Sequence, residues 1–237
     1  MSFAGISLIP YEKVEEKSNA SLEWENDSNW LPEGKFVFRF SVKNYPLSCD
    51  SKDETTIHTE ENPEGNHIHF ILDGKPYRDV FDTMFEARLT SGEHTVLAFL
   101  SDANHISLKN KSANFIAHFR TGDIKLMNRP MDMEKPMIYY NTPKEHYQVN
   151  EDKLNVVLDY FLMNTDISKE GNYVRATLDD VSSFNLYSWN PYVISGLGEG
   201  KHSLRIELRN KDNMLLPGPN TFVEREFTIQ DSPSPNE

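Results

Sequence analysis

Three histidines of this chain are spaced so that they could bind one metal ion. Two of them, His67 and His69, are two positions apart in an apolar segment at 66–73. On an extended strand, side chains with this spacing project from the same face, about 6 to 7 Å apart. Such a pair can bind one Zn²⁺ or Cu²⁺ if neighbouring strands or loops supply further ligands. We therefore treat His67 and His69 as candidate metal ligands.

The third candidate, His105, follows a nearly continuously apolar segment at 93–101. If 66–73 and 93–101 are adjacent strands of one sheet, His105 approaches the start of the first strand. The sequence thus predicts a metal or small-ligand site at His67, His69 and His105, with zinc or copper as the candidate ion. The alternative is that all three are ordinary exposed or packed histidines. Three other residues near these segments could donate ligand atoms: His58, Asp102 and Asn104.

An internal repeat helps to separate structural from functional histidines. Segment 171–180 aligns with 65–74, and segment 200–208 aligns with 92–100. The glycines that begin these segments are separated by nearly equal distances in both copies. Two copies with matching spacing predict tandem domains of one fold.

The repeat assigns different roles to different histidines. His202 occupies the position of His94, which indicates that this histidine belongs to the fold, through a hydrogen bond to a turn. The candidate ligands are not repeated, and the corresponding residues of the second copy are Tyr173 for His67, Arg175 for His69 and, approximately, Asn213 for His105. The fold therefore does not require the three candidate ligands.

The elements that must position these side chains are short strands. In segment 36–42, Phe36, Phe38, Phe40 and Val42 alternate with more polar residues, which is typical of a strand with one face in a core. No window of 11 or more residues shows a helical period, and Gly, Pro, Asn or Asp separate the strands. We predict an all-β fold of two tandem immunoglobulin-like antiparallel β-sandwich domains, at 1–125 and 126–237, with a disordered C-terminal tail. A barrel is the alternative.

Composition excludes several classes of function. The 237 residues carry a net charge of −13 at pH 7, which disfavours binding to nucleic acids or to anionic lipid surfaces. No segment reaches the roughly 18 consecutive apolar residues that span a bilayer. The single cysteine, Cys49, cannot form an intramolecular disulfide, so cysteine usage does not identify the compartment.

Motifs of known catalytic chemistry are missing. The chain has no Gly-x-Ser-x-Gly, no phosphate-binding glycine loop, no pair of CxxC motifs and no His-Glu-x-x-His. We therefore expect a non-enzymatic binding or adaptor protein. Two alternatives stay open: a metal-dependent enzyme that uses the same histidines, and a purely structural module for protein interaction.

Four segments together resemble an uncharacterised group of envelope proteins and lipoproteins from Bacteroidetes-type bacteria: 67–77, 92–97, 100–105 and 158–165. Members of that group carry two immunoglobulin-like domains, and some bear the label "phosphopeptide-binding", which no residue of this chain supports independently. The resemblance implies a location in the periplasm or at the cell surface. It also implies a leader and a lipid-bearing cysteine outside the printed sequence, with membrane contact only through that lipid anchor. The expected partner is an unknown protein or small ligand of the cell envelope.

Overall fold

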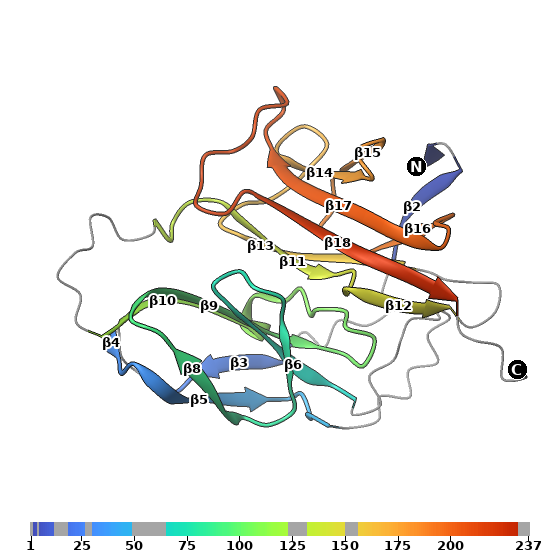
Figure 1. Ribbon diagram of the computed structural model, residues 1–237. Coiled ribbons are helices and arrows are strands. Elements are labelled where there is room, and N and C mark those ends of the chain that lie inside the picture. Colours follow the sequence, from blue (N-terminus) through green and yellow to red (C-terminus); the bar gives the residue numbers. More distant parts are fainter. Residues whose placement is uncertain are drawn as a thin grey trace, which may run out of the picture. The chain divides into compact units, whose positions relative to one another are not determined.

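A computed structural model describes residues 2–3, 5–11, 19–26, 30–48, 65–122, 132–149 and 156–231. These residues form two compact units, each built almost entirely of strands (Figure 1). The N-terminal sandwich contains the described residues of 19–48, 65–122 and 132–133. The C-terminal sandwich contains those of 2–11 and 134–231. The predicted all-β class with two sandwich domains is confirmed.

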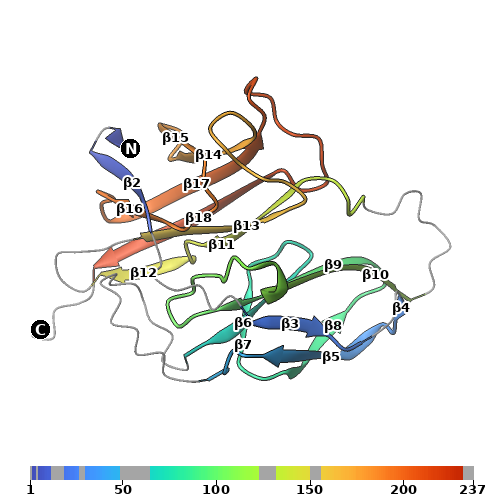
Figure 2. The same cartoon turned by 180° about the vertical axis from the view of Figure 1, so that it is seen from behind.

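The N-terminal sandwich has two sheets. One has the order β3-β5-β8 and the other the order β4-β10-β9-β6-β7; the pairs are antiparallel except for β4 and β10. Their bounds are β3 Ser21–Trp24, β4 Trp30–Leu31, β5 Gly34–Lys43, β6 His67–Leu72, β7 Arg78–Val80, β8 Met84–Leu89, β9 Gly92–Ser101 and β10 Asn114–Thr121, with a short 3₁₀ helix at Lys111–Ala113. Figure 2 shows the neighbouring strands β6 and β7 from behind.

Alternation along the strands builds the core of this sandwich. Phe38 of β5 is fully buried against Phe70 of β6 and Phe85 of β8, with ring centroids 4.8 and 5.6 Å away. Ile68 and Phe70 of β6 belong to the same core. Because side chains alternate along a strand, His67 and His69 must then lie on the opposite face of β6.

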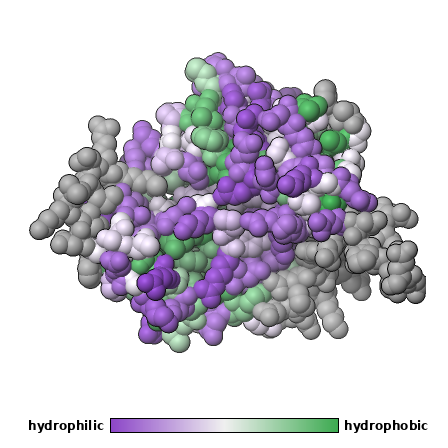
Figure 3. Space-filling model, in the orientation of Figure 1, coloured by the Kyte–Doolittle hydropathy of each residue, from purple (hydrophilic) through white to green (hydrophobic). Residues whose placement is uncertain are grey.

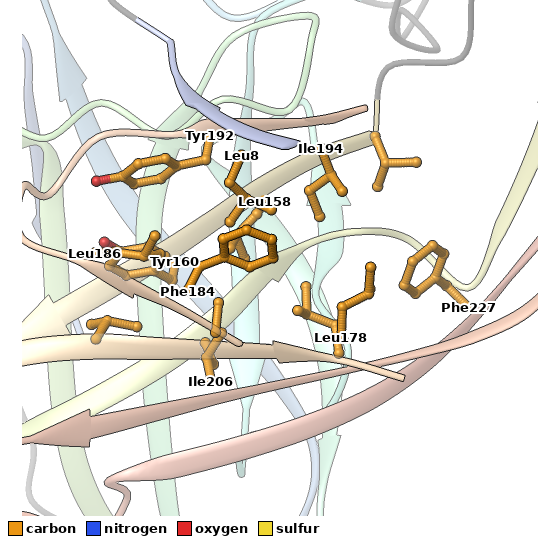
Figure 4. Packing of buried hydrophobic residues seen from close by; sticks show 14 of the residues in the cluster. Leu8, Leu158, Tyr160, Leu178, Phe184, Leu186, Tyr192, Ile194, Ile206 and Phe227 are labelled. Atoms are coloured by element: carbon orange, nitrogen blue, oxygen red, sulfur yellow. The ribbon is translucent and has the colours of Figure 1, made fainter. Parts of the chain in front are cut away.

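The C-terminal sandwich repeats this arrangement. Its sheets have the orders β12-β18-β17-β14-β15 and β1-β2-β16-β13-β11, where β1 is Ser2–Phe3 and β2 is Ile6–Pro10. β12 is parallel to β18 just as β4 is parallel to β10. The bounds are β11 Met137–Thr142, β12 His146–Val149, β13 Val156–Met163, β14 Tyr173–Leu178, β15 Ser182–Leu186, β16 Tyr192–Ser195, β17 Gly200–Arg209 and β18 Phe222–Asp231. Figure 4 shows the core between these sheets, where Tyr160, Phe184 and Ile206 lie close together.

The N-terminal strands correct the predicted domain boundaries. Residues 1–125 were assigned to the first domain, but β2 (Ile6–Pro10) pairs with β16 of the C-terminal sandwich, and β1 (Ser2–Phe3) pairs with β2. Leu8 of β2 is 1% exposed within the core of that sandwich. β13 pairs with only one edge of β16, so β2 covers the other edge, and the burial of Leu8 stabilises this pairing. The predicted boundary at 125/126 lies outside the described residues.

The described residues on the face shown in Figure 3 are mostly hydrophilic. In the view of Figure 3, apolar residues form small separate groups among hydrophilic ones. Among the described residues there is no helix that is long and apolar enough to cross a membrane. Cys49, His58 and most of the C-terminal tail lie outside the described residues, so the predictions for them stay predictions.

Candidate metal centre

Strand β6 places the first two candidate ligands side by side. His67 and His69 lie on the face of β6 that points away from Ile68 and Phe70, as their spacing predicts. Their rings turn toward one another, and the two Nε2 atoms are 2.7 Å apart. The predicted pair is thus formed by the strand itself.

The third histidine reaches this pair from the loop after β9. In β9, Ser101 lies opposite His67, so the loop begins beside the start of β6. His105 has a φ of 59°, in the left-handed region that few residues other than glycine adopt. Its Nδ1 lies 3.2 Å from Nε2 of His67 and 3.1 Å from Nε2 of His69. The three histidines that the sequence singled out therefore meet at one point.

The backbone of this loop is held by Asp102. Its Oδ1 accepts hydrogen bonds from the backbone N–H groups of Asn104, at 3.0 Å, and Ile106, at 2.9 Å. The N–H of His105 donates to the carbonyl oxygen of Asp102 at 3.0 Å. The sequence suggested Asp102 and Asn104 as oxygen donors to an ion. The donor cluster of His67, His69, Asp79 and His105 does not include Asp102, whose carboxylate shapes the loop that aims His105. The suggestion of Asn104 stays a prediction.

Asp79 is a fourth group that the sequence reasoning missed. It lies in β7 directly opposite His69. Its Oδ1 is 3.4 Å from Nε2 of His69, 3.5 Å from Nε2 of His67 and 3.7 Å from Nδ1 of His105. Only the register of β7 against β6 shows that Asp79 belongs to the site. In a chain with many acidic residues, the sequence alone does not distinguish this aspartate from the others.

The rings are buried and surrounded by aromatic side chains. His67 and His69 are 0% exposed and His105 is 2% exposed, whereas the Asp79 side chain is 27% exposed. Tyr77 stacks on the ring of His69 with a centroid distance of 3.9 Å and an interplanar angle of 10°. Phe81 contacts the His67 ring, and Phe99 contacts the His69 ring edge-on. An apolar shell of this kind limits solvent access and strengthens electrostatic interactions.

One hydrogen bond fixes the tautomer of His67. Its Nδ1 lies 2.8 Å from the carbonyl oxygen of Gly65, which can only accept, so Nδ1 carries the proton. In the neutral ring, Nε2 then presents a lone pair to the other two histidines. A backbone carbonyl that orients one ring nitrogen is the arrangement that metal-ligating histidines usually show.

A different histidine pair is structural, as the repeat predicted. Nδ1 of His94 lies 2.9 Å from Oδ2 of Asp73, and Nε2 lies 2.9 Å from the carbonyl oxygen of Thr90. In the C-terminal sandwich, His202 makes the same two contacts, with Asp179 at 2.8 Å and with the carbonyl oxygen of Gly198 at 2.9 Å. Both histidines tie a turn to the next strand and lie outside the described donor cluster.

Comparisons with known proteins find similar architectures at low identity. No family model and no curated protein matches the chain. The fibronectin(III)-like modules of Clostridium thermocellum CbhA are 11% identical, with a TM-score of 0.30, 89% of this chain covered and 94% of that one. A Bacteroides ovatus protein of a mixed-linkage glucan utilization locus, solved with a heptasaccharide, is 10% identical, with a TM-score of 0.23 and coverage of 96% and 48%.

A third similar structure, the Parabacteroides merdae β-glucuronidase, is 5% identical, with a TM-score of 0.23 and coverage of 89% of this chain and 25% of that one. The chain thus spans about half of the B. ovatus protein and a quarter of the glucuronidase. The function must be argued from the chain's own residues.

Proposed function

We propose that this protein is a non-enzymatic binding protein whose N-terminal sandwich binds one divalent transition-metal ion through His67, His69 and His105. The observation that carries the proposal is the convergence of three buried ring nitrogens, all within 3.2 Å of one another. Imidazole nitrogen is a preferred ligand of Zn²⁺ and Cu²⁺. A single ion among the three nitrogens satisfies all of them at once.

A proton is the competing occupant of this cluster. Two ring nitrogens 2.7 Å apart form a hydrogen bond if one of them carries hydrogen, and a protonated ring would be balanced by Asp79. A proton, however, joins only two nitrogens at a time, whereas the third nitrogen also points to the same place. An ion of charge +2 fits the three rings and the carboxylate together. Metal titration separates the two cases.

Catalysis by the same histidines is the competing function. A catalytic zinc site keeps an open coordination position, with a substrate or water in it and a general base within reach. In this cluster the Asp79 carboxylate faces the three nitrogens from the remaining side, and the three rings are buried. These features support binding without catalysis.

The location that we propose is the periplasm or the cell surface, with an envelope protein or small ligand as the partner. It is supported by the resemblance of segments 67–77 and 100–105 to envelope lipoproteins. The metal proposal does not depend on it, because the contacts within the N-terminal sandwich are the same in any compartment.

The experiment that tests the proposal is a metal titration of the purified, chelator-treated chain. Calorimetry with Zn²⁺ and with Cu²⁺, together with the metal content after dialysis, should show one ion per chain. His67→Ala and His69→Ala should each abolish this binding. The matched control is His146→Ala, which removes an exposed histidine of β12 and should leave binding unchanged. If the wild type binds no ion, or if both substitutions leave binding intact, the proposal is wrong.

A further inference from the structure

We propose that Asp79 is the fourth ligand and that the four side chains form a closed, tetrahedral zinc centre that cross-links β6, β7 and the loop after β9. This inference rests on the proposed metal binding and goes beyond it, because it assigns the ion, its coordination and its purpose. The centre stabilises the N-terminal sandwich and leaves no position open for a substrate.

The separations of the four donor atoms fit a tetrahedron. At the usual Zn–N and Zn–O distances, the edge of a regular tetrahedron is about 3.3 to 3.4 Å. The three N–N separations are 2.7, 3.1 and 3.2 Å. The three N–O separations are 3.4, 3.5 and 3.7 Å. The N–N separations are thus shorter than the edge of the tetrahedron around a zinc ion, and the N–O separations are equal to it or longer.

The geometry favours zinc over copper. Cu²⁺ binds most nitrogen and oxygen ligands more tightly than Zn²⁺, so a protein selects zinc by coordination geometry. Cu²⁺ prefers a square-planar or tetragonal arrangement, in which opposite ligands are about 4 Å apart. None of the six separations here is that long. The donor set also contains no sulfur, which argues against Cu⁺ as the resident ion.

Charge points to Asp79 as a ligand. A buried dication surrounded by three neutral imidazoles would keep its full charge in a poorly solvated place, which is costly. The Asp79 carboxylate halves that charge, and it is presented by the strand that pairs with β6. The partly exposed position of Asp79 also offers an ion a path to the buried nitrogens from the edge of the sheet.

The C-terminal sandwich has other residues at the corresponding place, and they join one another by hydrogen bonds. Asn213 has the loop position of His105, with a φ of 63° and the same N–H contact to the carbonyl three residues before it. Tyr173 stands at the position of His67 and donates a hydrogen bond to Oδ1 of Asn213 at 2.7 Å. Arg175 at the position of His69 donates to Oδ1 of Asn185 at 3.3 Å. Asn185 is opposite Arg175 just as Asp79 is opposite His69.

The two sandwiches therefore connect the same three elements by different means. In the C-terminal copy, the donors of Tyr173 and Arg175 meet the acceptor oxygens of Asn213 and Asn185. In the N-terminal copy, a carboxylate oxygen and the lone pair of His67 meet two further ring nitrogens. The Asp79 oxygen and the His67 lone pair can only accept, and one zinc ion would join both of them to the other two ring nitrogens at once.

The test uses Asp79→Asn, with Asp82→Asn as the matched control. Asp82 is an exposed residue three positions away, so its substitution makes the same change of charge without touching the cluster. The full-length chain is titrated with Zn²⁺, with Cu²⁺, and with Co²⁺, whose visible absorption is strong when it is four-coordinate and weak when it is six-coordinate. Thermal unfolding is followed with zinc and with chelator.

We expect the wild type and Asp82→Asn each to bind one four-coordinate Co²⁺, and one Zn²⁺ to displace it. Asp79→Asn should bind zinc at least tenfold more weakly, because even the loss of a second-shell partner lowers metal affinity about 10- to 100-fold. Zinc should raise the unfolding temperature of the wild type and of the control, and by less for Asp79→Asn. Equal zinc affinity and equal Co²⁺ spectra in Asp79→Asn and the wild type would overturn it, while binding through the three histidines would survive. The absence of any binding in the wild type would overturn both.

Discussion

Asp79 lies directly opposite His69 in the pairing of β6 with β7, with 3.4 Å between its Oδ1 and the Nε2 of His69. The two residues are ten positions apart, and only the turn between the strands brings them together. Asp79 adds a side chain from β7 to the histidine pair of β6, so the site is built from several elements. It also explains why the site is tied to the edge of the sheet, where β7 is the last strand.

Two substitutions of His105 can separate its role as a metal ligand from its role in the loop, where its backbone is left-handed. His105→Asn should lose metal affinity but keep the stability of the metal-free protein, because asparagine tolerates a positive φ and occupies the equivalent position as Asn213. His105→Ala should also lose metal affinity, and its metal-free form should be less stable than that of His105→Asn, by up to about 1 kcal/mol, because asparagine adopts the left-handed region more readily than alanine. Zinc calorimetry and urea unfolding with chelator measure the two effects. Asn213→Ala serves as the control for zinc binding, which should be unchanged; its loss of stability should be larger, because it also removes the oxygen that accepts from Tyr173. Equal metal-free stability of the Asn and Ala variants would contradict this assignment.

The hydrogen-bonded set of the C-terminal sandwich should replace the metal in the N-terminal one. The combined variant carries four substitutions: His67→Tyr, His69→Arg, Asp79→Asn and His105→Asn. We expect it to bind no zinc and to unfold at the same temperature with zinc and with chelator. The wild type should gain about 2.7 kcal/mol when zinc is present at 100 times its dissociation constant.

Amide exchange in β9 locates this effect, because β9 belongs to the N-terminal sandwich. Protection there should depend on zinc in the wild type and not in the combined variant, while β17 should be unaffected in both. A wild type whose β9 exchanges equally with zinc and with chelator would show that the ion does not stabilise this sandwich.

Strand β2 should stabilise the C-terminal sandwich. Leu8 is 1% exposed and belongs to that core, so Leu8→Ala should cost about 2 to 5 kcal/mol of stability. Ile9, the next residue, is 54% exposed, and Ile9→Ala should change stability by less than about 0.5 kcal/mol. Amide exchange after each substitution should show faster exchange in β16 and β13 for Leu8→Ala only. If the faster exchange appeared in β5 and β9 instead, β2 would belong to the other unit.

The C-terminal sandwich should lose stability in alkaline solution. Burial raises the pKa of Tyr139 to about 12, from a usual value of 10.0, and burial also raises the pKa of Tyr160 and of Tyr192. The unfolded chain ionises first, so the stability that Tyr139 contributes is fully present below pH 10 and is lost as the pH rises through about 12. Tyr160 and Tyr192 act in the same direction, because burial raises the pKa of each.

Urea unfolding between pH 9 and 12 measures this effect, together with the absorbance of tyrosinate. For Tyr139 we expect a loss on the order of 1–3 kcal/mol. Tyr139→Phe should be less stable than the wild type by a margin that narrows, or reverses, at the alkaline end. If the free energy of unfolding declined with pH at the same slope in both proteins, Tyr139 would be excluded as a cause of the alkaline loss of stability.

Much of the fold could be predicted because its signals are local. Alternation in β5 and β6 identifies the side chains that enter the core, and it places His67 and His69 together on the other face. The repeat of glycines and turns predicted a second copy of the sandwich. The comparison of the two copies also separated His94, which the fold uses, from the histidines of the candidate site.

The strands, the two related sandwiches and the three candidate histidines could be predicted from sequence. The reason is that a period of two and a turn are encoded over a few neighbouring residues, and that the repeat is visible as two similar segments. The folded structure was needed to show that β2 joins the C-terminal sandwich, that Asp79 faces His69, and that the left-handed turn at His105 aims its ring at the other two. These choices depend on which edges pair, and in which register, and that is settled by burial and hydrogen bonding between segments far apart in the chain.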